Sequence, residues 1–383
     1  MKQALYFFVI ILFFGAFTAP RDILADQVII NENENTERVP HAFSECFLKL
    51  KNIRDIDFSY NLQGLLSKRG MRVGIGCMIF PPTTLFIVMC ILRHFPHKKP
   101  MYCSDKTHHV SYGNQLGHSI IFINGFNDNS ERLFYAVKKS LDQNANTNIY
   151  APIFRDARTN RRFDVSWGQT YDCLQLIKFF QSIDFVHNDS ITGIVCHSLG
   201  GARFLTLYDL LKNKDSDFLK KAELPHDEAK AIFKKLKKIN KCPVAPLLDL
   251  QDTLSLHMRR WHIPFSRKLS GWICRYCMPF ITRGNFDPHF QSPKQRLKAW
   301  STEDFKNFHF FYPERDKTVG NIHVEWLCRK INVVKQTETT VITDKSVTIL
   351  PSSKLDVDEL QHESSYMLYL AANIAQQKNE KIE

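Results

Sequence analysis

Three features are missing from this sequence, and each absence narrows the class of protein. The 383 residues contain no internal repeat and no long low-complexity run, which excludes repeat architectures and disordered chains. The ten cysteines show no framework spacing, and a chain of this length needs no disulfide scaffold, so mostly free thiols are expected. Cys274 and Cys277 form a C-x-x-C without a second pair, which is too little for a zinc site.

Acidic residues are almost missing from His257 to Trp300, where Asp287 alone stands against nine lysines and arginines. Aromatic residues are interleaved with these cations. This mixture favours an anionic membrane surface, because aromatic rings settle at the headgroup level while cations meet acidic lipids. An ordinary solvated basic surface is the alternative, and nucleic acid ranks below both because no recognition motif accompanies the charge. The basic residues are Arg259, Arg260, Arg267, Lys268, Arg275, Arg283, Lys294, Arg296 and Lys298.

The composition is that of a folded protein. Hydrophobic residues make up 44% of the chain and charged residues 23%, with a net charge of +12. A chain of this length holds one large α/β domain with additions, or two modest domains.

Two hydrophobic stretches precede the regular part of the chain. Leu5 to Phe17 follows a single lysine and predicts a signal peptide or a short membrane anchor within residues 1–25, the alternative being a terminal helix packed on the domain. Val73 to Leu92, within an N-terminal extension of residues 26–100, is long enough to cross a bilayer, but Pro81 and Pro82 would kink a helix. A kinked span, a re-entrant hairpin and a buried strand pair all remain open for this second stretch.

From residue 101 onward, strands and helices alternate. Buried strands separated by amphipathic helices predict a parallel sheet with right-handed crossovers. A short hairpin is expected first, over 101–103 and 108–112. The expected strands are 119–123, 148–154, 191–196, 242–250, 307–312 and 346–350, and the expected helices include 130–141, 166–181 and 364–376.

The most informative stretch is Cys196-His197-Ser198-Leu199-Gly200. A β-branched apolar run leads into it and an amphipathic segment follows it, so it predicts a strand, a sharp turn and a helix, with Ser198 at the tip. Gly200 lets the strand and the helix approach closely. The Leu199 N–H opens the new helix, whose positive dipole end favours developing negative charge, so it is a candidate oxyanion donor.

This pentapeptide resembles the nucleophile elbow of the α/β-hydrolase family, in the His-Ser-Leu-Gly-Gly form common in lipases and esterases. Cys196 replaces the glycine that is usual at the first position. The resemblance covers about residues 117–378. It implies an α/β-hydrolase fold for 101–383, with a mostly parallel sheet flanked by helices, a helical cap insertion at about 254–302 and the N-terminal hydrophobic extension already described.

The same resemblance implies the remaining site residues. The loop after strand 119–123 has the place of the oxyanion loop, so the Phe126 N–H would be the second oxyanion donor, with Gly125 allowing close approach of the backbone. Asp316 lies in a turn that resembles the acid turn of the family, and His362 follows the last strand as the base. Asp304 and Asp249 are alternatives for the acid, and His323, expected on a helix surface, is the alternative base.

The sequence therefore predicts a serine hydrolase that cleaves carboxylic esters, most naturally lipid-like ones, with neither a metal nor an organic cofactor. Membrane association or export is expected from the N-terminal segment, and the oligomeric state stays open. A membrane-associated hydrolase-fold scaffold without turnover is the main alternative, because the chain departs from the family pattern at two positions. Cys196 stands where glycine is usual in the elbow, and Asn124 stands where histidine is usual in the oxyanion loop. A peptidase or amidase ranks lower, since the cap has almost no acids to bind a substrate amine.

Overall fold

The computed structural model describes part of the chain, all of it within the second of two units, Arg93–Glu383. The predictions for residues 1–25 and 26–100, including the stretch 73–92, lie outside the described residues, as does the expected helix 130–141. The described residues are 109–112, 117–125, 147–154, 166–260, 265–282, 284–316, 318–334, 344–351 and 365–377.

In these segments, seven strands form one sheet in the order β1-β3-β2-β4-β5-β6-β7. β1 pairs antiparallel with β3, and every other neighbouring pair is parallel. The chain therefore has the mostly parallel sheet that the sequence predicts. The strands are β1 (His109–Tyr112), β2 (His118–Ile123), β3 (Thr147–Pro152), β4 (Ile191–His197), β5 (Asn240–Val244), β6 (Phe308–Pro313) and β7 (Lys345–Leu350).

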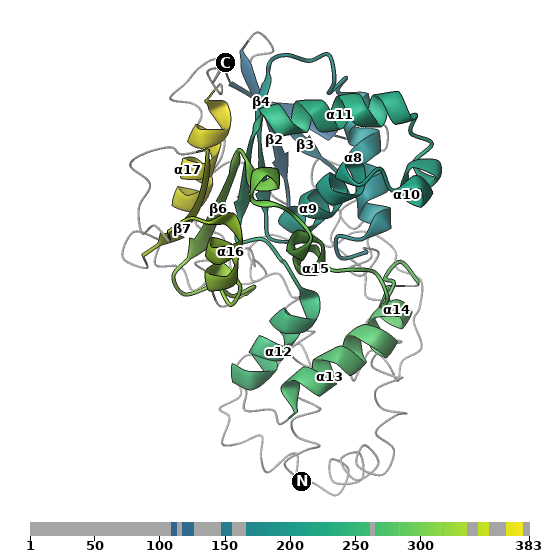
Figure 1. Ribbon diagram of the computed structural model, residues 1–383, viewed down its shortest axis with the longest axis vertical. Helices are drawn as coiled ribbons and strands as arrows, with labels where there is room; N and C mark the ends of the chain where they lie inside the picture. Colours follow the sequence, from purple (N-terminus) through teal and green to yellow (C-terminus); the bar gives the residue numbers. More distant parts are fainter. Residues whose placement is uncertain are drawn as a thin grey trace, which may run out of the picture. The chain divides into compact units, whose positions relative to one another are not determined.

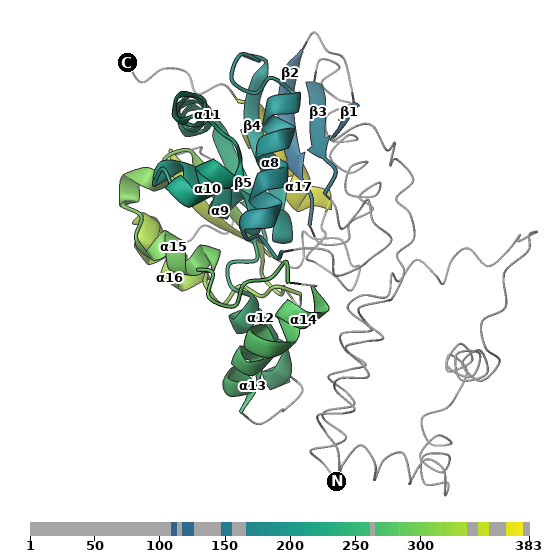
Figure 2. The same cartoon turned by 90° about the vertical axis from the view of Figure 1, so that its right-hand side faces the viewer.

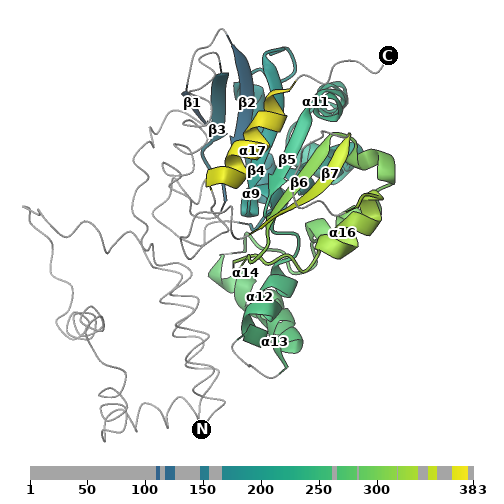
Figure 3. The same cartoon turned by 90° about the vertical axis from the view of Figure 1, so that its left-hand side faces the viewer.

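Helices cover both faces of the sheet, which is why the central strands β4 and β5 are buried along their whole length. α8 (Thr170–Ser182), α9 (Leu199–Lys212) and α11 (His226–Lys238) lie on one face, and α17 (Ser365–Gln376) lies on the other (Figures 2 and 3). In β2, the four residues from Ile120 to Ile123 are all 0% exposed. The alternation predicted from the sequence is thus confirmed, with layers of helices on the two faces.

α17 packs tightly against the middle of the sheet because β4 carries a glycine beneath it. A Cβ at Gly193 would lie 2.3 Å from the carbonyl oxygen of Ala375 and 2.7 Å from its Cα. Both atoms belong to backbone, so no side-chain adjustment could relieve the clash. A larger residue at this position would push the last helix off the strand that leads to Ser198.

The remaining helices lie between the strands in sequence. They are α10 (Ser216–Lys221), α12 (Leu250–Arg260), α13 (Ser266–Trp272), a π-helical turn (Ile273–Cys277), α14 (Met278–Ile281), α15 (Pro293–Lys298), a 3-10 turn (Thr302–Phe305) and α16 (Val324–Ile331). The segment from α12 to α15 is the helical insertion between β5 and β6. Its first helices, α12, α13 and α14, lie beyond the end of the sheet at which β5 leads into α12 (Figure 1). None of the described helices combines the length and the apolar character needed to cross a membrane.

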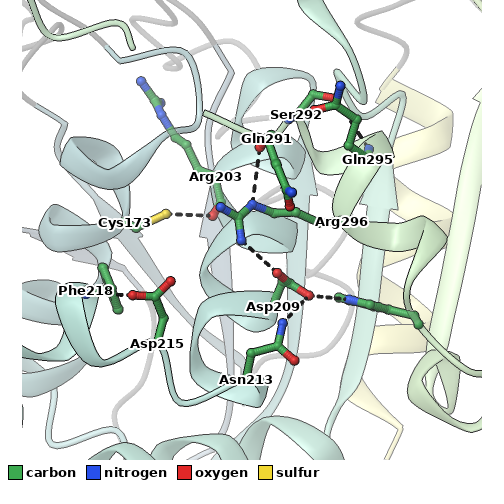
Figure 4. A network of polar contacts seen from close by, with 11 residues as sticks. Cys173, Arg203, Asp209, Asn213, Asp215, Phe218, Gln291, Ser292, Gln295 and Arg296 are labelled. Atoms are coloured by element: carbon green, nitrogen blue, oxygen red, sulfur yellow. Dashed lines mark hydrogen bonds and ion pairs between the residues drawn. The ribbon is translucent and has the colours of Figure 1, made fainter. Parts of the chain in front are cut away.

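The end of the insertion is fixed to α9 by one buried carboxylate. Asp209 accepts hydrogen bonds from Arg296 Nη1 at 2.8 Å and Trp300 Nε1 at 2.7 Å. Asn213 Nδ2 donates to the same carboxylate at 3.0 Å, and Figure 4 shows Asp209 between Arg296 and Asn213. Trp300 is 1% exposed and packs among Tyr208 and other aromatic rings of the core. Arg296 and Trp300 of the predicted cap therefore have a structural role.

A buried histidine makes stability depend on pH. His309 on β6 is 1% exposed, and its Nδ1 lies 3.1 Å from Ser346 Oγ. Burial, with a smaller effect of the Lys241 charge, lowers the pKa of His309 to about 4. The unfolded chain takes up this proton below about pH 6.5, whereas the folded chain takes it up only near its lower pKa. The free energy of unfolding therefore falls by roughly 1 kcal/mol per pH unit across this window as the pH decreases.

We expect His309→Gln to remove this part of the pH dependence in urea unfolding followed from neutral to acidic pH. The exposed His226 at the start of α11 provides the control, because His226→Gln should leave the slope as it is in the wild-type protein. Equal slopes for wild type and His309→Gln would contradict the assignment.

Candidate active site

Ser198 has a backbone conformation that serine rarely adopts. Its φ is 52° and its ψ is −118°, and this strain is sustained only where the surrounding structure fixes it. The Ser198 N–H donates to the carbonyl of Val244 at 2.9 Å, and the Ser198 carbonyl accepts from the N–H groups of Gly201 and Leu247, each at 3.0 Å. The turn between β4 and α9 is therefore held by β5 and the loop after it, with Ser198 at its tip.

Gly200 is the residue that makes this turn possible. A Cβ at Gly200 would lie 2.2 Å from the carbonyl oxygen of Ile123 and 2.5 Å from that of Asn124. Real Cβ atoms do not approach backbone oxygens so closely, so the first turn of α9 can lie against the end of β2 only because position 200 is glycine. The steric argument made from the sequence thus has a direct counterpart in the structure.

Cys196, which departs from the family pattern, fits without disturbing the turn. Its side chain is 0% exposed and lies in the core cluster that also contains residues of α8 and α9. Burial, and to a lesser degree Cys242, raises the pKa of Cys196 well above its usual range. Cys196 is therefore a neutral, apolar filler, and glycine is not required at this position in this chain.

The loop after β2 lies directly against the candidate nucleophile. A Cβ at Gly125 would lie 3.2 Å from Ser198 Cβ and 3.3 Å from His197 Nδ1. The structure thus brings together Gly125, Ser198 and the first residue of α9, Leu199, as the resemblance implied. Phe126, the second candidate oxyanion donor, lies outside the described residues.

A buried ion pair holds this loop from behind, and the sequence reasoning missed it. Arg203 on α9 is 0% exposed, its Nε donates to Asp172 Oδ2 at 3.1 Å, and its guanidinium stacks 3.7 Å from the Phe154 ring centroid. Arg203 Nη1 donates to the carbonyls of Asn124 and Gly125, each at 3.4 Å. The signal available in the sequence was a single arginine on the apolar side of the helix that follows the elbow.

Asp172 completes this support at the start of α8. Its carboxylate accepts from the backbone N–H of Ser166 at 3.2 Å and from that of Gly168 at 2.8 Å. Gly168 has a φ of +82°, and a Cβ there would lie 2.8 Å from the Cβ of Ala202 on α9. Asp172 thereby connects the segment before α8, the elbow helix and, through Arg203, the loop after β2.

Asp316 follows β6, at the same edge of the sheet as Ser198. Because neighbouring strands from β4 to β6 are parallel, their carboxyl ends share one edge, and Ser198 and Asp316 follow strands two positions apart. Asp316 is 2% exposed, and its Oδ1 accepts from the N–H groups of Thr318 at 2.7 Å and Val319 at 2.9 Å. One carboxylate oxygen is thus engaged in fixing the turn.

α12 of the insertion holds this turn, which the sequence did not indicate. Arg260 Nη2 donates to the Asp316 carbonyl at 3.0 Å, and Thr253 Oγ1 donates to the Val319 carbonyl at 3.4 Å. His257 Nε2 also bonds the Thr318 carbonyl. The insertion is therefore hydrogen-bonded directly to the turn that carries the candidate acid.

The candidate base lies outside the described residues. His362 falls in the sequence between the end of β7 at Leu350 and the start of α17 at Ser365. Since β7 is parallel to β6, the chain leaves β7 at the edge that carries Ser198 and Asp316. The assignment of His362 stays a prediction.

The three residues that the sequence offers as alternatives for the catalytic base and acid have other roles in the structure. His323 was expected on a helix surface, which is wrong: it is 7% exposed at the start of α16, with its Nε2 3.5 Å from Asp252 Oδ2, and burial first and Lys294 second lower its pKa to about 4. Asp304 precedes β6, so it lies at the opposite edge of the sheet from Ser198, where it pairs with Lys212. Asp249 accepts from the Asp252 N–H at 3.0 Å at the start of α12.

Apolar side chains cluster beside the elbow. Leu199, Ala202, Leu247 and Val319 are buried together, with partly buried Trp167 and Leu250 packed against them. The cluster joins the residue after Ser198 to a residue of the acid turn. The surroundings of the candidate nucleophile on this side are therefore apolar side chains.

No group of three or more His, Cys, Asp or Glu side chains that could hold a metal ion occurs in the described part of the chain. The C-x-x-C cysteines are free thiols, and burial is the largest cause that raises the pKa of Cys274 to about 12 and that of Cys277 to about 11. Both thiols lie on the helical run of the insertion, Cys277 buried and Cys274 half-buried.

The strand order and the elbow define the class of fold. A parallel sheet with one antiparallel edge strand, a strained serine between β4 and α9, and an aspartate turn after β6 together make this chain an α/β-hydrolase fold. The fold class predicted from the sequence is confirmed.

The sequence matches no protein-family model, and no curated protein is significantly similar to it. Among solved structures, the chain is similar to the monoacylglycerol lipase of Paleococcus ferrophilus, with 12% identity, 70% of this chain and 97% of that chain covered, and a TM-score of 0.38. A lipase/esterase from Lactobacillus plantarum is 11% identical, with 64% and 87% covered and a TM-score of 0.40. The thioesterase domain from the curacin biosynthetic pathway is 11% identical, with 70% and 94% covered and a TM-score of 0.38.

Proposed function

We propose that this protein is a serine hydrolase that cleaves carboxylic esters through Ser198, His362 and Asp316. The observation that carries the proposal is the backbone of Ser198, held at a φ of 52° and a ψ of −118° at the tip of a turn. Such strain has to be compensated by the rest of the fold and is retained where a nucleophile needs that orientation. A serine that merely capped α9 could do so in an unstrained extended conformation.

The proposed chemistry is acyl transfer to water. His362 takes the proton of Ser198 Oγ as that oxygen attacks the ester carbonyl, and Asp316 orients and stabilises the imidazolium. The Leu199 and Phe126 N–H groups hold the tetrahedral oxyanion. His362 then gives its proton to the leaving alcohol, and water, deprotonated by the same histidine, releases the acyl group from Ser198.

A lipid-like ester is the substrate class that the surroundings of Ser198 favour. The cluster of Leu199, Leu247 and Val319 beside the nucleophile is apolar, which suits an acyl chain and offers nothing to a charged amine. This argues against the peptidase or amidase alternative. Membrane association or export through the N-terminal hydrophobic segment is proposed on the sequence alone.

The scaffold alternative has lost one of its two supports. Cys196 is one of the two departures from the family pattern, but its side chain is buried in the core and Ser198 beside it has a φ of 52°. The remaining departure is Asn124, whose carbonyl is held by Arg203. A direct test of serine reactivity separates the enzyme from the scaffold.

We expect a fluorophosphonate probe to label the purified wild-type protein and to leave its adduct on the peptide containing Ser198. Ser198→Ala and His362→Ala should lose labelling, because one removes the nucleophile and the other removes its base. Ser216→Ala, at an exposed serine that opens α10, is the matched control and should label as the wild type does. An unlabelled but folded wild-type protein would support the scaffold and overturn the proposed function.

A further inference from the structure

The insertion contains a helical run with two contrasting faces. α13, the π-helical turn and α14 follow one another without a break from Ser266 to Ile281. One face of this run is buried, and α13 lies beside α12 in both views (Figures 1 and 2). The buried residues of the run are Ser266, Ser270, Ile273, Cys277, Met278 and Ile281. Since α12 holds the inner side, the outer side is turned to solvent.

The outer face carries large aromatic side chains where a solvated helix would carry polar ones. Phe265 is 76% exposed, Trp272 41% and Tyr276 58%, and the Trp272 and Tyr276 ring centroids are 5.9 Å apart. Only two other large hydrophobic residues in the described part of the chain are exposed, Ile322 and Val334. The aromatic exposure is therefore concentrated on this one helical run.

Cations flank these rings, and acids are missing. Arg267, Lys268 and Arg275 are exposed on the same run, and none of the three forms an ion pair within 4.0 Å among the described residues, although Arg267 lies near enough to Asp252 of α12 to act on it electrostatically. The sequence has no Asp or Glu from residue 253 to residue 286. We call Phe265, Arg267, Lys268, Trp272, Arg275 and Tyr276 the aromatic-basic face.

We propose that the aromatic-basic face docks on an anionic membrane surface. Aromatic rings on one side of a helix settle at the headgroup level, and lysine and arginine beside them meet acidic phospholipids. Proteins that stack bases of single-stranded nucleic acid do so along a basic groove, whereas these rings stand on the outer side of a helix. An acidic protein partner would also use aromatic rings and arginine, so the experiment below separates such a partner from a membrane.

Docking by this face would bring the candidate active site to the lipid. α12 packs against the run on one side and is hydrogen-bonded to the turn of Asp316 and Val319 on the other. The advantage to catalysis rests on the proposed function, but the docking itself does not. Lipid binding and serine chemistry can therefore be measured separately.

The test uses the full-length protein and a signal that comes from the face itself. Vesicles of phosphatidylcholine containing brominated chains, with and without phosphatidylserine, quench tryptophans that enter the headgroup region. Subtracting the signal of Trp272→Phe from that of the wild type isolates Trp272 among the five tryptophans of the chain. We expect Trp272 to be quenched on the vesicles with phosphatidylserine, and less so on phosphatidylcholine alone.

Charge removal gives the quantitative prediction. Arg267→Gln, Lys268→Gln and Arg275→Gln combined should weaken the quenching titration of Trp272 about a hundredfold, because each cation near an acidic surface contributes about a fivefold factor. The combined control Lys221→Gln, Lys230→Gln and Lys234→Gln removes the same charge from exposed positions on α10 and α11 and should titrate as the wild type does.

Three results would overturn the proposal. Trp272 could stay unquenched on vesicles with phosphatidylserine, or the two triple variants could weaken it equally. Polyglutamate or single-stranded DNA could instead bind through the face while vesicles do not, which would make the partner an acidic protein or a nucleic acid. Hydrolysis of a soluble ester should be the same in wild type and in the triple variant of the face, so a failed lipid test leaves the proposed function standing.

Discussion

Ser198→Ala will lower kcat for ester hydrolysis by about a millionfold, and His362→Ala will lower it by about the same factor. Asp316→Asn will cost about ten-thousandfold, because the imidazole then loses its orientation and its counter-charge. The double variant of Ser198 and His362 will be no slower than the worse single variant. These residues act as one unit in a single proton transfer, so removing the second changes nothing once the first is gone.

In the same variants, KM and the residual kcat provide the internal control for the triad. KM should stay close to that of the wild type in all of these variants, because the apolar cluster beside the elbow is unchanged. Steady-state kinetics on a soluble ester measure both constants. Multiplicative losses in the double variant, or a residual rate in Ser198→Ala within tenfold of the wild type, would contradict the triad.

Stability supplies a second, independent signature of the elbow. Ser198 is strained at a φ of 52°, and a non-glycine residue in such a conformation costs about 1–3 kcal/mol. Ser198→Gly should therefore raise the melting temperature while it abolishes turnover. Ser198→Ala keeps the strain and should melt close to the wild type. A lower melting temperature for the glycine variant would argue against a strained nucleophile.

The parts of the fold that were predictable from the sequence are those specified by local pattern. The run from Ile120 to Ile123 is apolar at every position, and the strand that leads to Ser198 is followed by a turn with Gly200 two residues after the serine. Both patterns depend on neighbours in the chain, so both could be interpreted without knowing what packs against them. Ser198 and Gly200 could be assigned to the turn because that turn, too, is specified by neighbouring residues.

Errors arose where tertiary contacts decide the local structure. A strand was expected over 242–250, but β5 ends at Val244 because Ala245 turns with a φ of 43°. Pro246 then packs against Gly201 of α9, where a Cβ would lie 2.5 Å away. The apolar composition of Leu247 and Leu248 suggested a strand, whereas these residues are buried beside the elbow and the core cluster.

For residues 257–300, the composition predicts the kind of surface but not which residues form it. The aromatic residues of this segment were counted together, although Trp300 is 1% exposed and Phe286 8%, while Phe265, Trp272 and Tyr276 are exposed. Residues 265, 268, 272 and 276 are exposed and residues 266, 270, 273 and 277 are buried. Both sets have the spacing of three and four that places residues on one helix face, so the spacing alone does not say which set faces outward. The composition predicted a membrane-facing surface, and the structure selects the six residues that could form it.

The support of the site could not be predicted, because it joins residues far apart in the sequence. Arg203 and Asp172 are 31 positions apart, and Arg203 and Gly125 are 78 apart. No pattern in a single sequence pairs them. Their arrangement leads to the second large expected effect, because both charges are buried.

Arg203→Met will lower the free energy of unfolding by about 3–5 kcal/mol, since breaking one side of a buried ion pair leaves the other charge without compensation. The side chains of Arg203 and Asp172 are each 1% exposed, so water cannot replace the lost partner. The variant should unfold at clearly lower urea concentration than the wild type. A loss below about 1 kcal/mol, the size of a surface pair, would contradict this assignment.

The double variant Arg203→Met with Asp172→Asn is the control. Asparagine can still accept from the Ser166 or Gly168 N–H, and neither residue of the pair then carries a charge. We expect most of the stability lost in Arg203→Met to return in the double variant, because the penalty comes from the uncompensated carboxylate. Equal losses in the single and the double variant would mean that packing of the arginine on Phe154 matters more than its charge.

Arg203→Lys separates the effect on catalysis from the effect on stability. Lysine keeps the charge that Asp172 needs, but it lacks the planar fork that donates to the Asn124 and Gly125 carbonyls while it bonds the carboxylate. Because the next amide in that loop is the proposed oxyanion donor of Phe126, a looser loop should lower kcat by about tenfold to a hundredfold. KM should change little, since the oxyanion exists only in the transition state. A proportional rise of KM with unchanged kcat would instead make Arg203 part of substrate binding.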